Sequence, residues 1–402
     1  MKILIKQEKK KPYFPFLIIL FFISLFILFY GTSINVARAE NTENAQDVLD
    51  ETIKEQLENL DLSDLQAYID ALEKSGNKSV ADRLLEYIQG TKFNYQSFGK
   101  EILWILFSKV AEVFPAFACI MAVSLLTGLV SMLQEGQSKP SAVGMVRLIA
   151  YTSALIPLVS VLADCVYATV NGIKNMQTQM GIIYPLMMTL LAACGNSVTV
   201  AVCKPAVGFF ATIISSMIYQ IIMPLTIIIM AFSFIGNFTS NLKIGKFTGF
   251  FKSVNKWLIG VSVSIFGLFF TLQGITSSSY DGIVRRAAKY AIGNGVPIIG
   301  GFLSGGFDLA VAGGVLIKNS LGSMGIFLII AVLLEPIVLL ISVSVMLRLT
   351  AAITQPMGNG EISSVLGETA DNLRYCVACL LFVAFLYFLT ILIMICCTES
   401  MF

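Results

Sequence analysis

Long apolar runs alternate with short polar stretches along the chain after residue 100. A helix needs about 20 apolar residues to cross a bilayer. On this criterion the pattern predicts membrane segments at Val113–Leu133, Leu148–Val170, Gly181–Cys203, Pro205–Phe234, Trp257–Gln273, Val296–Ile317, Leu321–Leu347 and Tyr375–Cys396. Gly195-Asn196-Ser197 interrupts the third run, which therefore fits either a full span or a re-entrant pair of half-helices. The expected fold is all-α and polytopic, with about 7–8 membrane segments.

Residues 40–100 carry a different pattern, in which apolar side chains recur at helical spacing between polar ones. Three such stripes are Leu49, Ile53, Leu57 and Leu60, then Leu65, Tyr68, Ile69 and Leu72, then Val80, Leu84, Leu85 and Ile88. This periodicity predicts two or three short amphipathic helices. Ser63 followed by Gln66 fits a capping box at the start of the second helix. Too few apolar residues are present for these helices to form a large core of their own.

The first 39 residues resemble a secretory signal. A lysine-rich start precedes the apolar run Tyr13–Tyr30, and Ala37-Arg38-Ala39 places small residues where signal peptidase cleaves. An uncleaved anchor helix is the alternative, because the apolar run is long for a signal. Both interpretations put residue 40 on the outer side of a membrane. The predicted organisation is therefore a signal peptide over 1–39, an acidic extracytoplasmic region over 40–100 and a multi-span domain over 101–402.

Composition supports the membrane assignment and excludes several chemistries. Hydrophobic residues make up 56% of the chain, charged residues 13%, and the mean hydropathy is +0.81. A protein this apolar requires lipid as the solvent for most of its surface. Because the chain contains no histidine, imidazole metal sites and Ser-His triads are excluded. We expect no enzymatic activity, no metal, no cofactor and no nucleic-acid partner.

Cysteine usage adds no catalytic or redox candidate. All 8 cysteines lie in or beside apolar segments. Cys376 and Cys379 have C-x-x-C spacing but no second pair of ligands, so we interpret them as small apolar side chains.

Four charged residues fall within the apolar segments or at their ends, namely Asp164, Lys204, Asp308 and Glu335. Ionisable groups in a membrane are costly and usually face a cavity or one another. Two interpretations stay open: a polar pathway or ion-pair network, and charges that reach the interface from helix ends. The second fits Asp164 and Lys204 better than Asp308 and Glu335. The basic residues of the loops leave the orientation of the C-terminal half open.

The run Val296–Ile317 is unusually rich in glycine for a membrane segment. Small residues at this spacing let helices approach closely, so the default interpretation is helix packing. The alternative is that the segment lines a path beside Asp308. The glycines concerned are Gly301, Gly305, Gly306, Gly313 and Gly314.

Two long runs carry a resemblance to a known family. They are Gly236–Trp257, GNFTSNLKIGKFTGFFKSVNKW, and Gln273–Leu321, QGITSSSYDGIVRRAAKYAIGNGVPIIGGFLSGGFDLAVAGGVLIKNSL. Together with the signal-like start, the acidic helical stretch and the multi-span body, they resemble the stage III sporulation protein AE family of endospore-forming bacteria. The resemblance covers essentially the whole chain.

This resemblance implies a place and a set of partners. It implies a multi-pass protein of the mother-cell membrane around the forespore, with its N-terminal region in the intermembrane space. The implied partners are subunits of a secretion-like channel complex, including a secretion-type ATPase and ring-forming proteins, and a homo-oligomer is compatible with it. The implied role is support of late forespore gene expression, with no catalytic residues. A self-sufficient secondary transporter and a pure scaffold are the rival functions.

Overall fold

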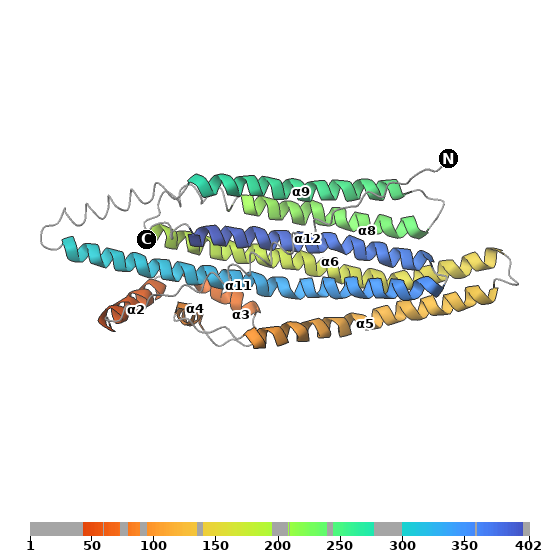
Figure 1. Ribbon diagram of the computed structural model, residues 1–402, viewed down its shortest axis with the longest axis horizontal. Helices are drawn as coiled ribbons and strands as arrows, with labels where there is room; N and C mark the ends of the chain where they lie inside the picture. The colour runs from red at the N-terminus through yellow and green to blue at the C-terminus, as the bar shows by residue number, and fades with distance from the viewer. Residues whose placement is uncertain are drawn as a thin grey trace, which may run out of the picture. The chain divides into compact units, whose positions relative to one another are not determined.

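The computed structural model describes residues 43–58, 60–72, 79–88, 95–134, 140–194, 208, 210–238, 244–276, 300–357 and 360–396. All regular elements within these ranges are helices (Figure 1). Contacts divide the chain into two units, Met1–Val48 and Leu49–Phe402, and the following concerns the second. The predicted signal peptide lies outside the described residues.

Three short helices come first: α2 (Glu43–Glu58), α3 (Ser63–Leu72) and α4 (Val80–Ile88). The long helices are α5 (Tyr95–Gln134), α6 (Pro140–Ala193), α8 (Met223–Phe238), α9 (Gly245–Thr276), α11 (Gly300–Thr354) and α12 (Gly360–Cys396). A π-helical turn, η1 (Ile218–Ile222), leads into α8, and a short 3-10 turn, η2 (Gln355–Met357), follows α11.

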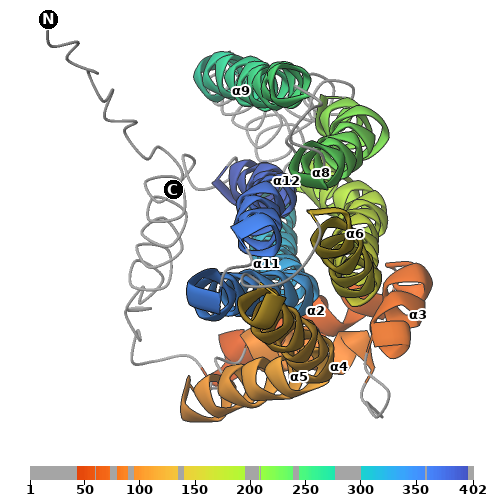
Figure 2. The same cartoon turned by 90° about the vertical axis from the view of Figure 1, so that its right-hand side faces the viewer.

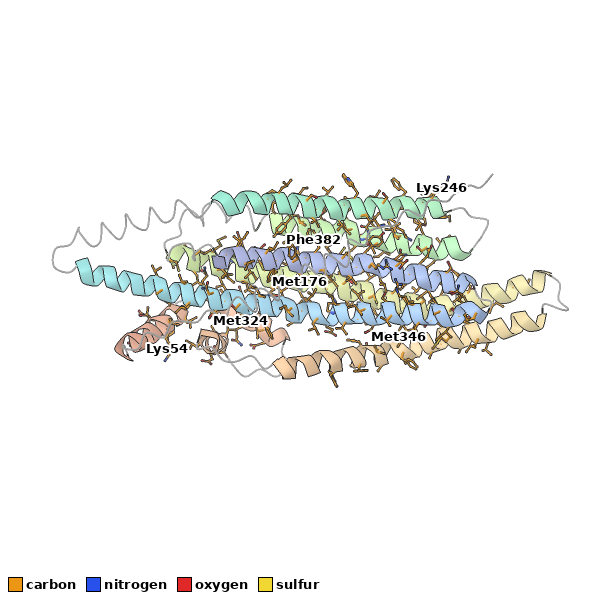
Figure 3. The ribbon with its side chains drawn as sticks, in the orientation of Figure 1. Lys54, Met176, Lys246, Met324, Met346 and Phe382 are labelled. Carbon is orange, nitrogen blue, oxygen red and sulfur yellow. The ribbon has the colours of Figure 1, made fainter. Side chains whose placement is uncertain are left out.

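The long helices run side by side as a bundle built around α11, α12 and α6 (Figures 1 and 2). Helix α5 packs on α6 and α11, while α9 packs mainly on α8, which itself lies against α12. Met176, Met324 and Phe382 contribute buried side chains from the three central helices (Figure 3). The apolar surface removed from water or lipid is therefore concentrated where these helices meet.

Helix α6 differs from the sequence prediction, since it covers the second predicted segment and much of the third without a break. The connecting residues NGIKNMQTQM (171–180) contain no proline that would end the helix. Gly172 lies where an added Cβ would be 3.0 Å from Leu380 and 3.2 Å from Pro336. Close packing thus explains this glycine within a continuous helix. The predicted interruption at Gly195-Asn196-Ser197 lies outside the described residues.

Helix α11 likewise joins two predicted segments, Val296–Ile317 and Leu321–Leu347, from Gly300 onwards. Only Lys318-Asn319-Ser320 separates these segments, and the three residues continue the helix. Helix α9 also begins before its predicted segment and includes Lys246, Lys252 and Lys256.

Five helices within the described ranges are long and apolar enough to cross a membrane, by length and composition. Their apolar stretches are Phe107–Leu126, Tyr151–Ala193, Phe210–Gly236, Val311–Thr354 and Ile362–Ile395. The all-α membrane fold is confirmed, whereas the number of spans predicted from the sequence is not.

The predicted apolar stripes of the three short helices face the interior of the protein. Ile53, Leu65, Ile69 and Leu84 are each at most 2% exposed. Helix α3 packs on α6, and α4 packs on α11. Residues 49–88 therefore belong to the same unit as the long helices. The division at residue 100 stays a prediction, and α5 runs across it.

The start of α3 departs from the predicted capping box. The Ser63 hydroxyl and backbone N–H both donate to Asp61 Oδ1, the latter over 3.2 Å. These two hydrogen bonds lower the pKa of the Asp61 carboxyl. Gln66 instead accepts from the Val80 N–H at 2.7 Å, which ties α3 to the start of α4. The cap is therefore supplied by Asp61, and Gln66 joins two helices.

Candidate functional site: polar groups among the long helices

The glycine-rich stretch lies at the start of α11 and is helical where described. Gly301, Gly305 and Gly306 occupy its first two turns. A Cβ on Gly313 would lie 3.3 Å from Gln56 Oε1, and one on Gly314 would lie 2.8 Å from Cys194 Sγ. Because Gly313 and Gly314 have no side chain, α2 and the end of α6 can pack closely against α11 at these two positions. Asp308 lies on the same helix, and its side chain is outside the described set.

Glu335 lies on α11 immediately before Pro336 and is paired across helices. Its carboxylate is 3.0 Å from Lys109 Nζ on α5, and Lys109 also lies 3.1 Å from Glu112. The Glu335 side chain is 68% exposed, against 21% for Lys109. The structure therefore places Glu335 at the bundle surface in an ion pair that joins α5 to α11.

The other two predicted charges do not join this group in the described structure. Asp164 is exposed on α6, and Lys204 lies outside the described residues. Of the predicted charges whose side chains are described, Glu335 is paired between helices and Asp164 is exposed on α6, so these two do not form one group.

A buried lysine that the sequence analysis missed lies within α11. Lys318 is 0% exposed, and its Nζ donates to the carbonyls of Met394 (3.0 Å) and Ile395 (2.7 Å) in the last turn of α12. The final carbonyls of a helix lack intrahelical donors and carry partial negative charge. Lys318 thus caps α12 from a neighbouring helix. Placing it in a connection between two predicted segments hid this role.

A second missed feature is a row of hydrogen-bonded polar side chains along α8 and the helical residues before it. At one end, Ser215 accepts a hydrogen bond from Gln177 Nε2 at 2.9 Å. The Tyr387 hydroxyl is also 2.9 Å from Ser215 Oγ. Gln177 comes from α6 and Tyr387 from α12, so three segments meet at one buried hydroxyl.

The same row continues towards the end of α8. Asn255 of α9 donates from Nδ2 to Thr226 Oγ1 at 3.0 Å, and Thr226 donates to the Ile222 carbonyl at 2.8 Å. Asn372 of α12 donates to Ser233 Oγ, also at 3.0 Å. We call Ser215, Thr226 and Ser233 with their partners Gln177, Tyr387, Asn255 and Asn372 the α8 polar row.

Two carboxamide oxygens in this row have no hydrogen-bond partner within the described structure, Asn255 Oδ1 and Asn372 Oδ1. Both side chains are 0% exposed. The polar hydroxyls fall seven residues apart on α8 at Thr226 and Ser233, a spacing that keeps them on one side of a helix. That spacing was the sequence signal that could have revealed the row.

The described candidate residues take part in hydrogen bonds, an ion pair and helix packing. Among the residues that the structure describes, no group of three or more His, Cys, Asp or Glu side chains could hold a metal ion. Cys376 and Cys379 are buried as free thiols on α12. Tyr68 of α3 donates to the Asn175 carbonyl of α6 at 3.1 Å, and burial raises the pKa of Tyr68 to about 12.

Comparison with known proteins gives one consistent result. A family profile described as "Stage III sporulation protein AE" matches residues 79–398. A curated protein of Bacillus subtilis (strain 168), named "Stage III sporulation protein AE", is 25% identical over 317 residues, which cover 78% of this chain and 78% of that protein. No solved structure matches.

Proposed function

Because the chain belongs to the stage III sporulation protein AE family, we propose that it is a non-enzymatic membrane subunit of a secretion-like complex that links the mother cell and the forespore. The family supplies a sporulation role, and the fold supplies a helical body with membrane-spanning character. The observation that carries the proposal is the family match over the described long helices.

The proposed location is the mother-cell membrane around the forespore, with α2–α4 in the intermembrane space. The outer faces of these helices are acidic, with exposed carboxylates at Glu51, Glu55, Glu58, Asp64 and Asp82. Charged outer faces steer association with oppositely charged partners. The proposed partners are the other subunits of the complex, including its secretion-type ATPase and ring-forming proteins.

The test is deletion of the gene in an organism that carries it, with a fluorescent reporter under a late forespore-specific promoter. We expect engulfment to be completed and the late signal to be lost. Expression of the intact gene should restore that signal. A normal signal after deletion would contradict the proposal. Solute uptake by the purified protein alone in liposomes would then favour the transporter.

Within this function we propose a polar role for Asp308 beside the glycines of α11. Asp308 lies just before the apolar stretch Val311–Thr354 of α11, and a carboxylate there is retained at low cost only where it meets a partner or water. Asp308→Leu should therefore lower the late reporter signal several-fold while the protein still inserts in the membrane. Immunoblotting of membrane fractions measures insertion. A wild-type reporter signal in this variant would rule out the polar role.

A further inference from the structure

The surface of α6 changes character part of the way along the helix. Among the described side chains of α6, the exposed large hydrophobic ones are Met145, Ile149, Ile156, Val159 and Tyr167. Beyond Tyr167 the exposed residues are polar or small: Lys174, Asn175, Thr178, Gly181, Pro185, Thr189, Ala192 and Ala193. Lipid tails contact apolar side chains, so only the first part of α6 has a surface suited to hydrocarbon.

Helix α11 shows the same change in the opposite order along the chain, with its exposed apolar side chains in the second part of the helix. From Ile341 onwards it exposes a stripe at four-residue spacing, Ile341, Val345, Leu349 and Ile353. Among described residues 311–334, Leu316, at 37% exposure, is the one exposed large hydrophobic side chain. Gly172 of α6 lies against Pro336 of α11. The two changes of surface therefore occur at matching heights on neighbouring helices.

The short helices cover the polar part of both long helices. Ile53 and Gln56 of α2 reach Gly313 of α11, and Tyr68 of α3 bonds to Asn175 of α6. The outer faces of these helices carry exposed carboxylates. Such carboxylates cannot lie in hydrocarbon without a large cost. The exposed faces of α6 and α11 beside these short helices must therefore lie outside it.

Helix length leads to the same division. The apolar stretches of α6 and α11 contain 43 and 44 residues, which is about 65 Å of helix at 1.5 Å per residue. The hydrocarbon layer is only about 30 Å thick. The exposed apolar side chains that are described on α6 fall between Met145 and Tyr167, which is about 33 Å of helix.

We propose that lipid contacts α6 only up to Tyr167 and α11 only after Glu335, and that the remaining exposed face of both helices, beside α2–α4, is in contact with water. The ion pair between Lys109 and Glu335 then lies at the boundary, where charged groups reach water. The assignment concerns the face formed by α5, α6 and α11, because α9 exposes large apolar side chains at Phe247, Trp257 and Leu268. It is independent of the sporulation role.

The test is site-specific labelling of the full-length protein in sealed membranes with a membrane-impermeant maleimide. Three single substitutions at exposed positions are compared: Thr178→Cys beyond the boundary, Val159→Cys within the proposed lipid zone, and Ala67→Cys on α3 as the marker of side. Mass spectrometry of each peptide measures labelling, and labelling after detergent solubilisation normalises it. The native Cys119, exposed on α5 in the lipid zone, serves as an internal reference.

We expect Thr178→Cys and Ala67→Cys to react from the same side of the membrane. Both should react about ten-fold or more faster than Val159→Cys, because a thiol in hydrocarbon does not form the reactive thiolate. Protection of Thr178→Cys equal to that of Val159→Cys would overturn the proposal. Reaction of Thr178→Cys only from the side opposite to Ala67→Cys would also overturn it, since residues 171–180 would then connect two separate spans.

Discussion

At the scale of single residues, Gly314 is a tightly constrained position. An added Cβ would be 2.8 Å from Cys194 Sγ, closer than a real Cβ approaches another atom. Gly314→Ala should therefore destabilise the protein by about 1–3 kcal/mol, because either side chain must shift in a packed interface. Thermal unfolding of the detergent-solubilised protein measures the loss.

Two further variants make this prediction specific. Removing the sulfur with Cys194→Ala in the Gly314→Ala background should recover part of the lost stability. Gly181→Ala, on a helix position with nothing within 4 Å, should be neutral or slightly stabilising. Equal losses for the two glycine variants would show that close approach at Gly314 is unimportant.

Lys318 provides the second residue-scale prediction. Replacement by methionine keeps the length of the side chain but removes both hydrogen bonds to the end of α12. A hydrogen bond from a charged donor contributes about 1.5–3 kcal/mol to stability. Without these two bonds, the last turn of α12 should open more often. Hydrogen exchange should then accelerate for amides just before Cys396, with Lys256→Met, at an exposed lysine of α9, as the control. Unchanged exchange would show that Lys318 does not cap the helix.

At the scale of elements, the α8 polar row fixes how α8 meets its neighbours. Thr226 already donates to the Ile222 carbonyl, so its oxygen is the acceptor for Asn255. Thr226→Val would leave the buried Asn255 amide without that acceptor, at a cost of about 1–3 kcal/mol. In the double variant Thr226→Val with Asn255→Leu, both polar groups are absent, so its loss should be smaller than the sum of the two single losses.

Thermal unfolding of the two single variants and the double variant measures this coupling. Ser264→Ala is the control, because Ser264 bonds to the Gly260 carbonyl on the exposed side of α9. Strictly additive losses for Thr226 and Asn255 would contradict a shared hydrogen bond.

The helices themselves were largely predictable, whereas their continuity was not. Apolar runs predicted the long helices, and stripes such as Ile53 and Leu57 predicted the short ones, because burial on one face determines both patterns. Whether a polar stretch such as 171–180 ends a helix depends on what packs around it. Gly172 could mark a turn from sequence alone, and only its contact with Leu380 and Pro336 explains it within α6.

The candidate site was less predictable for a related reason. Hydropathy marks Glu335 as interior because its sequence neighbours are apolar, yet its side chain lies at the bundle surface. Lys318 is marked as a connection, yet it is buried. Both outcomes depend on which neighbouring helix faces the residue, and a single sequence does not contain that information.

At the scale of the whole molecule, the ion pair between Lys109 and Glu335 joins segments far apart in the chain. Exchanging its charges tests whether the Glu335 carboxylate only holds two helices together or takes part in a polar pathway. Lys109→Glu would place a third carboxylate beside Glu112 and Glu335, so α5 should pack less well on α11 and spore yield should fall. An exposed pair contributes only about 0.2–1 kcal/mol in water, so most of the effect should come from repulsion.

Adding Glu335→Lys recreates a pair of opposite charges and should restore most of the spore yield. Counts of heat-resistant spores measure the yield, and immunoblots of the membrane fraction measure the amount of protein. If the exchanged pair is as stable in membranes as the wild type but sporulation stays defective, the carboxylate at Glu335 is needed for its chemistry, and the purely structural role is wrong.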